Sequence, residues 1–170
     1  MSLKYFNYGL VLLLITQSSS ETDKEWTLDN VTIYETFDEL EPLLHIDNDT
    51  TYLIKFWATW CGPCVKELPY FEGMHEHYKG KPFKVVLVSL DFKKQLEKKV
   101  IPFLNENKIK SDVVLLADGK ANKWIDKVDP EWSGAIPITL VVSGKERTFY
   151  ETEFHSEEEL IEIISPFLNK

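Results

Sequence analysis

The sequence predicts an α/β protein with a central mixed β-sheet flanked by helices. Short apolar, strand-like runs alternate with segments of helical periodicity along most of the chain. The last two strand-like runs are joined by the turn signal Ser143-Gly144-Lys145, which indicates an antiparallel hairpin, and a helix follows them. No glycine-rich phosphate loop occurs, so no motif supports a nucleotide-binding fold. The predicted element order is β-α-β-α-β-α-β-α-β-β-α.

Six strands are predicted from apolar or β-branched runs bounded by turn residues. The run Tyr52–Trp57 is interrupted only by Lys55, and the run Lys84–Leu90 is centred on four consecutive aliphatic residues. Both fit strands that are buried on both faces. The other predicted strands are Val31–Tyr34, Val113–Ala117, Ile138–Val142 and Arg147–Phe154.

Five helices are predicted from helical periodicity and from start and stop signals. Capping boxes at Thr36-x-x-Glu39 and Ser156-x-x-Glu159 mark the beginning of the first and the last helix. Pro102 lies inside the helix predicted over Phe92–Asn107, so two shorter helical pieces are expected there. The other three helices are predicted over Val65–Tyr78, Phe92–Asn107 and Ala121–Val128.

Composition restricts the class of protein. At 170 residues the chain is long enough for one domain with a sizeable core. A hydrophobic content of 44% and an aromatic content of 13% indicate a globular protein and exclude a disordered one. The formal net charge of −9 argues against nucleic acid or an anionic membrane surface as the main partner.

The first twenty residues have the pattern of a secretory signal peptide. Lys4 supplies the positive charge, Gly9–Ile15 the apolar core, and Ser18-Ser19-Ser20 the small residues before a cleavage site. The apolar part is shorter than the about 20 residues that a transmembrane helix needs. An uncleaved N-terminal membrane anchor is the alternative. We therefore predict a signal peptide at 1–20, a flexible lead-in at 21–30 and one domain at 31–170.

Both cysteines lie in the run Trp60-Cys61-Gly62-Pro63-Cys64, between a predicted strand and a predicted helix. The unsatisfied N–H groups and the positive dipole end at a helix start favour thiolate over thiol at the first cysteine. A disulfide between residues three apart closes a very small loop and adds little stability, so a redox role explains the pair better than a structural one. We expect Cys61 to be the exposed attacking thiolate and Cys64 the buried resolving thiol.

A metal site is the other use of such a pair. Cys61, Cys64, His75 and His77 together offer a Cys2His2 set. Structural zinc sites of this type have a longer separation and a loop between their ligand pairs. We therefore predict no metal, and no cofactor other than the redox-active disulfide itself.

The nine-residue run from Phe56 to Cys64 resembles the active site of the thioredoxin superfamily. The continuation Val65–Pro69 is similar to the exported TlpA/ResA-type branch, which carries a glutamate three residues after the second cysteine and a proline two residues later. Ile136-Pro137-Ile138-Thr139 resembles the cis-proline segment of the superfamily. The resemblance implies a thioredoxin-like fold with an extra helical insertion, here about Phe92–Lys110, between the active-site half and the cis-proline half.

The same resemblance implies an exported thiol–disulfide oxidoreductase. In such an enzyme the Cys61 thiolate attacks a substrate disulfide, and Cys64 then resolves the mixed disulfide. An exposed tryptophan at position 60 makes an apolar wall for the substrate groove, whereas Trp57 belongs to the core. The implied substrate-binding residues are Trp60, Gly62, Pro63, Ile136 and Pro137.

Two further residues concern the proton chemistry of the site. Glu67 lies one helical turn after Cys64 and is the candidate proton shuttle for the second thiol, with a solvated surface glutamate as the alternative. Lys55 departs from the superfamily pattern, because many thioredoxins carry a buried acid at this strand position. Its ammonium either pairs with Glu67 or favours the thiolate by tuning its pKa, or it reaches water while its stem packs.

The Gly-Pro pair between the cysteines matches reducing members of the superfamily. The implied partners are protein disulfide substrates, apocytochrome c among them, and a membrane thiol-transfer protein as electron donor. We expect a monomer with no nucleic-acid partner in a bacterial periplasm, tethered to the membrane if the signal is not cleaved. Three alternatives stay open: a disulfide isomerase or oxidase, a peroxidase (although no Thr-x-x-Cys pattern occurs), and a non-enzymatic binding module.

Overall fold

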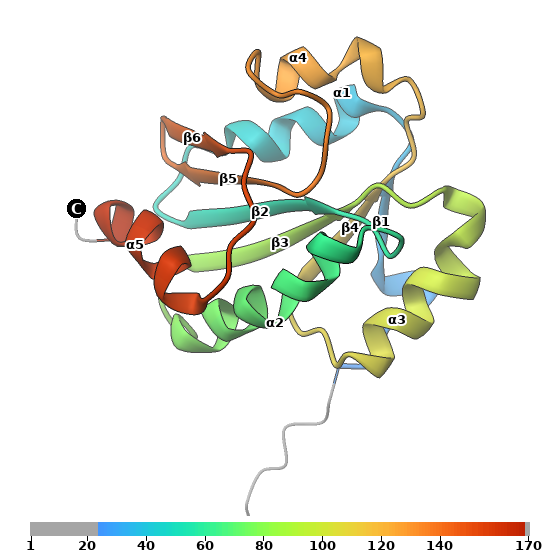
Figure 1. Ribbon diagram of the computed structural model, residues 1–170, viewed down its shortest axis with the longest axis horizontal. Helices are drawn as coiled ribbons and strands as arrows, with labels where there is room; N and C mark the ends of the chain where they lie inside the picture. Colours follow the sequence, from blue (N-terminus) through green and yellow to red (C-terminus); the bar gives the residue numbers. More distant parts are fainter. Residues whose placement is uncertain (1–23, 169–170) are drawn as a thin grey trace, which may run out of the picture.

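The computed structural model describes residues 24–168, so the predicted signal peptide lies outside the described residues. Within this range one mixed sheet has the strand order β1-β4-β3-β2-β5-β6 (Figure 1). Its strands are β1 (Thr32–Tyr34), β2 (Thr51–Trp57), β3 (Phe83–Ser89), β4 (Asp112–Leu116), β5 (Ile138–Ser143) and β6 (Glu146–Tyr150). The first four in chain order run parallel, and β5 and β6 form an antiparallel hairpin beside β2. The predicted fold class and element order are confirmed.

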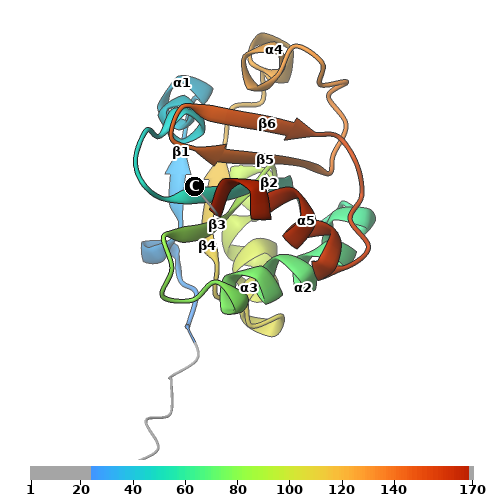
Figure 2. The same cartoon turned by 90° about the vertical axis from the view of Figure 1, so that its left-hand side faces the viewer.

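Helices cover both faces of this sheet (Figures 1 and 2). On one face lie α1 (Phe37–Leu40) and α4 (Ile125–Val128), and on the other lie α2 (Gly62–His77), α3 (Ile101–Glu106) and α5 (Glu157–Leu168). Each face has its own hydrophobic core, which we call the α1/α4 core and the α2/α5 core. None of the helices in residues 24–168 has the length and apolar character needed to cross a membrane.

The central strand β2 contributes side chains to both cores. Leu53 and Trp57 belong to the α2/α5 core, whereas Ile54 and Phe56 belong to the α1/α4 core. Because side chains alternate along a strand, Lys55 faces the α2/α5 core. All seven residues of β2 are buried. The sequence interpretation of this run as a buried central strand is confirmed.

The structure differs from the expected flexible lead-in at 21–30 over the part that it describes. The indole of Trp26 is buried, and its Nε1–H donates to the carbonyl oxygen of Ile109 at 2.7 Å. The Trp26 backbone N–H donates to Asn105 Oδ1 at 2.8 Å, and a 3-10 turn follows at Leu28–Asn30. A tryptophan buries a large apolar area once its N–H finds a partner, so this one residue fixes the segment to the domain.

The predicted helical insertion lies between β3 and β4, but it is less regular than expected. A 3-10 turn at Lys93–Gln95 leads into a π-helical turn at Leu96–Val100, and α3 begins only at Ile101. Pro102 sits in the first turn of α3. Proline has no N–H and its ring displaces the carbonyl four residues earlier, so the wider turn before it is a physical consequence of its position.

Two element boundaries near the cysteines also differ from the prediction. Helix α2 begins at Gly62, three residues before the predicted start, so it includes Cys64 in its first turn. Strand β6 ends at Tyr150 and not at Phe154, and residues 151–156 form an irregular connection to α5. Phe154 is buried in the α2/α5 core, which turns the chain away from the sheet edge. This connection becomes part of the site described below.

Candidate active site

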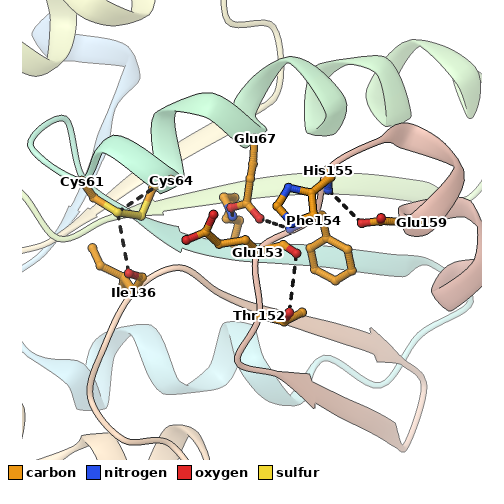
Figure 3. A network of polar contacts seen from close by, with 10 residues as sticks. Cys61, Cys64, Glu67, Ile136, Thr152, Glu153, Phe154, His155 and Glu159 are labelled. Atoms are coloured by element: carbon orange, nitrogen blue, oxygen red, sulfur yellow. Dashed lines mark hydrogen bonds and ion pairs between the residues drawn. A yellow bond between two sulfur atoms is a disulfide. The ribbon is translucent and has the colours of Figure 1, made fainter.

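Cys61 and Cys64 are joined in a disulfide at the amino end of α2 (Figure 3). Cys61 is the N-cap residue, and its Sγ accepts a hydrogen bond from the Cys64 backbone N–H at 3.2 Å. Pro63 lies in the first turn, where a missing N–H has no partner to lose. Once the disulfide is reduced, the same N–H and the helix dipole stabilise a Cys61 thiolate.

The two sulfurs differ in accessibility, although less than expected. Cys64 is fully buried, as predicted, but Cys61 is only 6% exposed and not the open thiol that the sequence indicated. The reason is the Ile136–Pro137 segment, whose peptide bond is cis, as predicted. The Ile136 carbonyl oxygen lies 3.8 Å from Cys61 Sγ and covers part of it (Figure 3).

The surface around Cys61 is formed by residues that the sequence singled out. The side chain of Trp60 is 62% exposed, and Gly62 and Pro63 are exposed as well. Ile136 is half-buried beside them, whereas Pro137 is buried. The structure therefore places the predicted substrate-binding residues around one sulfur. The core position of Trp57 is also confirmed.

The loop before Cys61 is held by a residue that the sequence reasoning missed. The buried carboxylate of Asp91 accepts hydrogen bonds from the Thr59 backbone N–H at 2.9 Å and from the Thr59 hydroxyl at 2.6 Å. The hydroxyl of Ser89 donates to the same carboxylate at 2.9 Å. The signal that could have identified Asp91 is a pair of polar residues, Ser89 and Asp91, at the end of a strongly apolar strand.

A buried ion pair lies behind the disulfide. Lys55 Nζ donates to Glu67 Oε2, and the second carboxylate oxygen of Glu67 accepts the backbone N–H of Phe154. Nζ also lies 4.4 Å from the centroid of the Phe71 ring. Burial lowers the pKa of Lys55, and the negative charge of Glu67 opposes that effect.

This pair decides between the alternatives left open for Lys55 and Glu67. Lys55 is 0% exposed, so the expectation that its amine reaches water is wrong, and the pairing with Glu67 is observed instead. Glu67 is 2% exposed, so it is not a solvated surface glutamate. Its role as a proton shuttle and the tuning of the thiol by Lys55 stay predictions.

No metal centre is formed by the described residues. Nowhere in residues 24–168 do three or more His, Cys, Asp or Glu side chains converge in a way that holds a metal ion. Both sulfurs of the Cys2His2 set considered above are engaged in the disulfide.

Residues 42–147, a span that contains both cysteines and the cis-proline segment, match the AhpC/TSA family. The chain belongs to the AhpC/TSA family. Among the curated relatives of this AhpC/TSA protein, Sporulation thiol-disulfide oxidoreductase A of Bacillus subtilis (strain 168) is 34% identical over 71 residues, which is 42% of this chain and 43% of the relative. Thiol-disulfide oxidoreductase ResA of Oceanobacillus iheyensis is 49% identical over 39 residues, 23% of this chain and 20% of the relative.

These alignments span less than half the length of either curated relative. A solved structure, StoA from Bacillus subtilis, superposes on the AhpC/TSA protein with a TM-score of 0.52 at 25% identity, over 68% of this chain and 83% of the other. Together with the family match, this confirms the thioredoxin-like fold and the resemblance to ResA-type proteins that the active-site run predicted.

Proposed function

We propose that this AhpC/TSA-family protein is a thiol–disulfide oxidoreductase that reduces disulfides of exported proteins. The observation that carries the proposal is the Cys61–Cys64 disulfide at the start of α2, covered on one side by the cis Ile136–Pro137 segment. A helix start stabilises the thiolate, and a carbonyl within 4 Å of the same sulfur offers backbone to an extended substrate.

The reaction has two exchange steps. The Cys61 thiolate of the reduced protein attacks one sulfur of the substrate disulfide, which forms a Cys61–substrate disulfide and releases the other substrate sulfur as a thiolate. Cys64 then gives up its proton and attacks Cys61, which closes the Cys61–Cys64 disulfide and releases the second substrate thiolate. Two electrons pass to the substrate in each cycle. In this proposal the Glu67 carboxylate takes the proton from Cys64.

Substrate binding is assigned to the surface around Cys61. Trp60 supplies an exposed aromatic face, which contributes apolar area at a low cost in conformational entropy. Gly62 and Pro63 present little side chain above the sulfur, and Ile136 offers its backbone beside it. This arrangement fits an extended polypeptide that carries the target disulfide, and no small-molecule cofactor enters the reaction.

The proposed location is the bacterial periplasm. The pattern of residues 1–20 supports export, and a membrane tether remains if that segment is retained. Outside the cytoplasm a dithiol oxidises unless it is re-reduced, so the proposal includes a membrane thiol-transfer protein as electron donor. Apocytochrome c is one substrate of the required chemistry, and the protein acts as a monomer.

Reduction of insulin by dithiothreitol tests the activity. The wild-type protein is expected to accelerate the reaction, and Cys61→Ser is expected to run at the uncatalysed rate. A second variant, Cys64→Ser, is expected to accumulate substrates as mixed disulfides on Cys61, which identifies them. Equal rates for wild type and Cys61→Ser would show a binding module in place of an enzyme.

A further inference from the structure

The proposed reaction requires that a proton leave the buried thiol of Cys64. The thiol of Cys64 has to lose a proton in every cycle, yet its side chain is fully buried. Glu67 and Lys55, which lie behind it, are 2% and 0% exposed. A proton accepted by this pair therefore has no direct contact with water. Turnover requires a group that connects the pair to solvent.

Glu153 is placed to make that connection. It is exposed and lies in the connection between β6 and α5, next to Phe154, whose N–H donates to Glu67. Figure 3 shows its carboxylate pointing back from this connection toward the Cys61–Cys64 disulfide. Glu153 is thus open to water and is next in sequence to Phe154, whose backbone N–H is bonded to the buried carboxylate.

The charge of Glu153 also acts on the pair. Burial lowers the pKa of Lys55, and the negative charges of Glu67 and Glu153 both oppose that effect. An interaction of this kind falls off with distance, so it agrees with the position of the Glu153 carboxylate in Figure 3. This role of Glu153 was not predicted, because position 153 was expected to lie in the strand Arg147–Phe154.

The remaining surroundings of the pair hold few groups that can exchange a proton. The ring of Phe71 lies under Lys55 Nζ, and the phenol of Tyr150 lies at the end of β6, where burial raises its pKa. On β5, Thr139 is directly opposite Lys55, and its buried hydroxyl has no hydrogen-bond partner among residues 24–168. The nearby His155 is exposed, and its backbone N–H donates to Glu159.

We propose that Glu153 exchanges protons between the buried Lys55–Glu67 pair and solvent while Cys64 attacks the mixed disulfide. The proton leaves Cys64 Sγ for the Glu67 carboxylate, passes to the Glu153 carboxylate and then to water. The Cys61–substrate bond breaks, the Cys61–Cys64 bond forms and the substrate leaves as a thiolate. Glu153 acts on the sulfur only through the pair, so it is a positioning residue. This proposal rests on the proposed oxidoreductase function.

The attack by Cys64 can be observed by itself with 5,5′-dithiobis(2-nitrobenzoate). Reduced protein reacts in two phases. Cys61 first forms a mixed disulfide and releases one nitrothiobenzoate, and Cys64 then releases the second. Stopped-flow absorbance at a pH about two units below the ordinary thiol pKa of about 8.5 keeps the second phase dependent on proton removal. The rate of the first phase therefore measures the reactivity of Cys61, and the rate of the second measures the attack by Cys64.

The Glu153→Gln variant is expected to slow the second phase about tenfold at low buffer concentration, a fraction of the about 100-fold or more that general acid–base catalysis supplies. The first phase stays at the wild-type rate, because Cys61 needs no proton transfer through the pair. Raising the concentration of a small carboxylate buffer restores the second phase in the variant, since buffer replaces the missing exchanger. Wild type shows no such buffer dependence.

Two variants complete the comparison. Glu153→Asp keeps a carboxylate and is expected to retain most of the second-phase rate. Glu106→Gln removes an exposed carboxylate from α3 and is expected to leave both phases unchanged. A wild-type second phase in Glu153→Gln at low buffer would overturn the proposal. So would a slow second phase that buffer does not restore, because that result indicates a structural role.

The two proposals fail in different ways. If wild-type protein shows no second phase, or does not accelerate insulin reduction, the oxidoreductase function itself is wrong. If wild type is active and Glu153→Gln matches it at every buffer concentration, only the role of Glu153 is wrong.

Discussion

The two faces of β2 carry different kinds of buried side chain. On the α1/α4 side Ile54 and Phe56 belong to an apolar and aromatic cluster, in which Phe37 stacks on Trp124 at 5.4 Å between ring centroids. On the α2/α5 side the strand presents Lys55 to a buried carboxylate, directly behind the disulfide. One face is a core of ordinary composition, and the other contains a fully buried ion pair.

The difference indicates what each face is for. Apolar residues of similar volume often stabilise a core as well as a buried ion pair does, because removing two charges from water costs about as much as their attraction returns. A pair at such a position therefore calls for a reason other than stability. Its position beside Cys64 supplies one, since the resolving sulfur has to exchange a proton. The predictions below test whether the two faces separate in this way.

The largest expected effect is a loss of stability, which substitutions on both faces should cause. Only the substitution on the α2/α5 face should also change the thiol chemistry. Phe37→Ala and Phe71→Ala each remove a buried phenyl ring and should each lower the free energy of unfolding by about 4 kcal/mol, measured by urea titration. Only Phe71→Ala should also change the second phase of the nitrobenzoate reaction, because its ring contacts Lys55. An equal effect of both variants on that phase would remove the distinction between the faces.

Breaking the ion pair from one side should come next in size. Lys55→Met leaves the Glu67 carboxylate buried without its cation and is expected to cost about 3 kcal/mol in urea unfolding. Lys55→Met/Glu67→Gln removes both charges and keeps an acceptor for the Phe154 N–H, so most of the loss should return. A double variant as unstable as Lys55→Met would show that the pair stabilises the fold in its own right.

The pH dependence of stability should carry the signature of Lys55. Its pKa is lowered in the folded protein from 10.5, so between the folded pKa and about 10.5 the unfolded chain binds more protons than the folded one. Stability contributed by this group therefore rises with pH across that window, by up to about 1.4 kcal/mol per pH unit. Plotted against pH, the free energies of unfolding of wild type and Lys55→Met/Glu67→Gln should have different slopes in that window. Equal slopes would contradict the assignment of this effect to Lys55.

The smallest expected effect concerns the attacking sulfur. If Lys55 favours the thiolate, Lys55→Met should raise the pKa of Cys61 by less than about one unit, because the ammonium is already paired with Glu67. Ultraviolet absorbance of the thiolate in the reduced proteins measures this directly. A thiol pKa that does not move would restrict Lys55 to the proton chemistry of Cys64.

Much of the fold followed from local patterns. Periodicity and capping boxes placed most strands and helices within a few residues, because segments such as Tyr52–Trp57 and the last helix are strongly patterned. The exception is the helix predicted from Phe92, which becomes α-helical only at Ile101. The redox role of the cysteine pair followed from its position at a predicted helix start, whereas Pro137 was identified by the resemblance of its segment to the thioredoxin superfamily. The cis bond itself came from the resemblance and not from the pattern.

The missed features depend on contacts between distant segments. Asp91 and Thr59 are 32 positions apart, and Phe154 and Glu67 are 87 positions apart. Strand pairing and the turn after Tyr150 bring them together, and neither is encoded in a local window. Trp26 was missed for the same reason, because its polar neighbours resemble a linker and its partners lie beyond residue 100.

The anchoring of Trp26 also fixes where an attachment can be made. It is bonded just ahead of β4, at the amino ends of the parallel strands, whereas Cys61 follows the carboxyl end of β2. A capture tag or sensor-chip linkage joined ahead of Lys24 is therefore attached at the amino ends of the parallel strands, at the opposite end of the sheet from the sulfurs. Protein immobilised in this way presents its disulfide and the exposed Trp60 to a flowing partner.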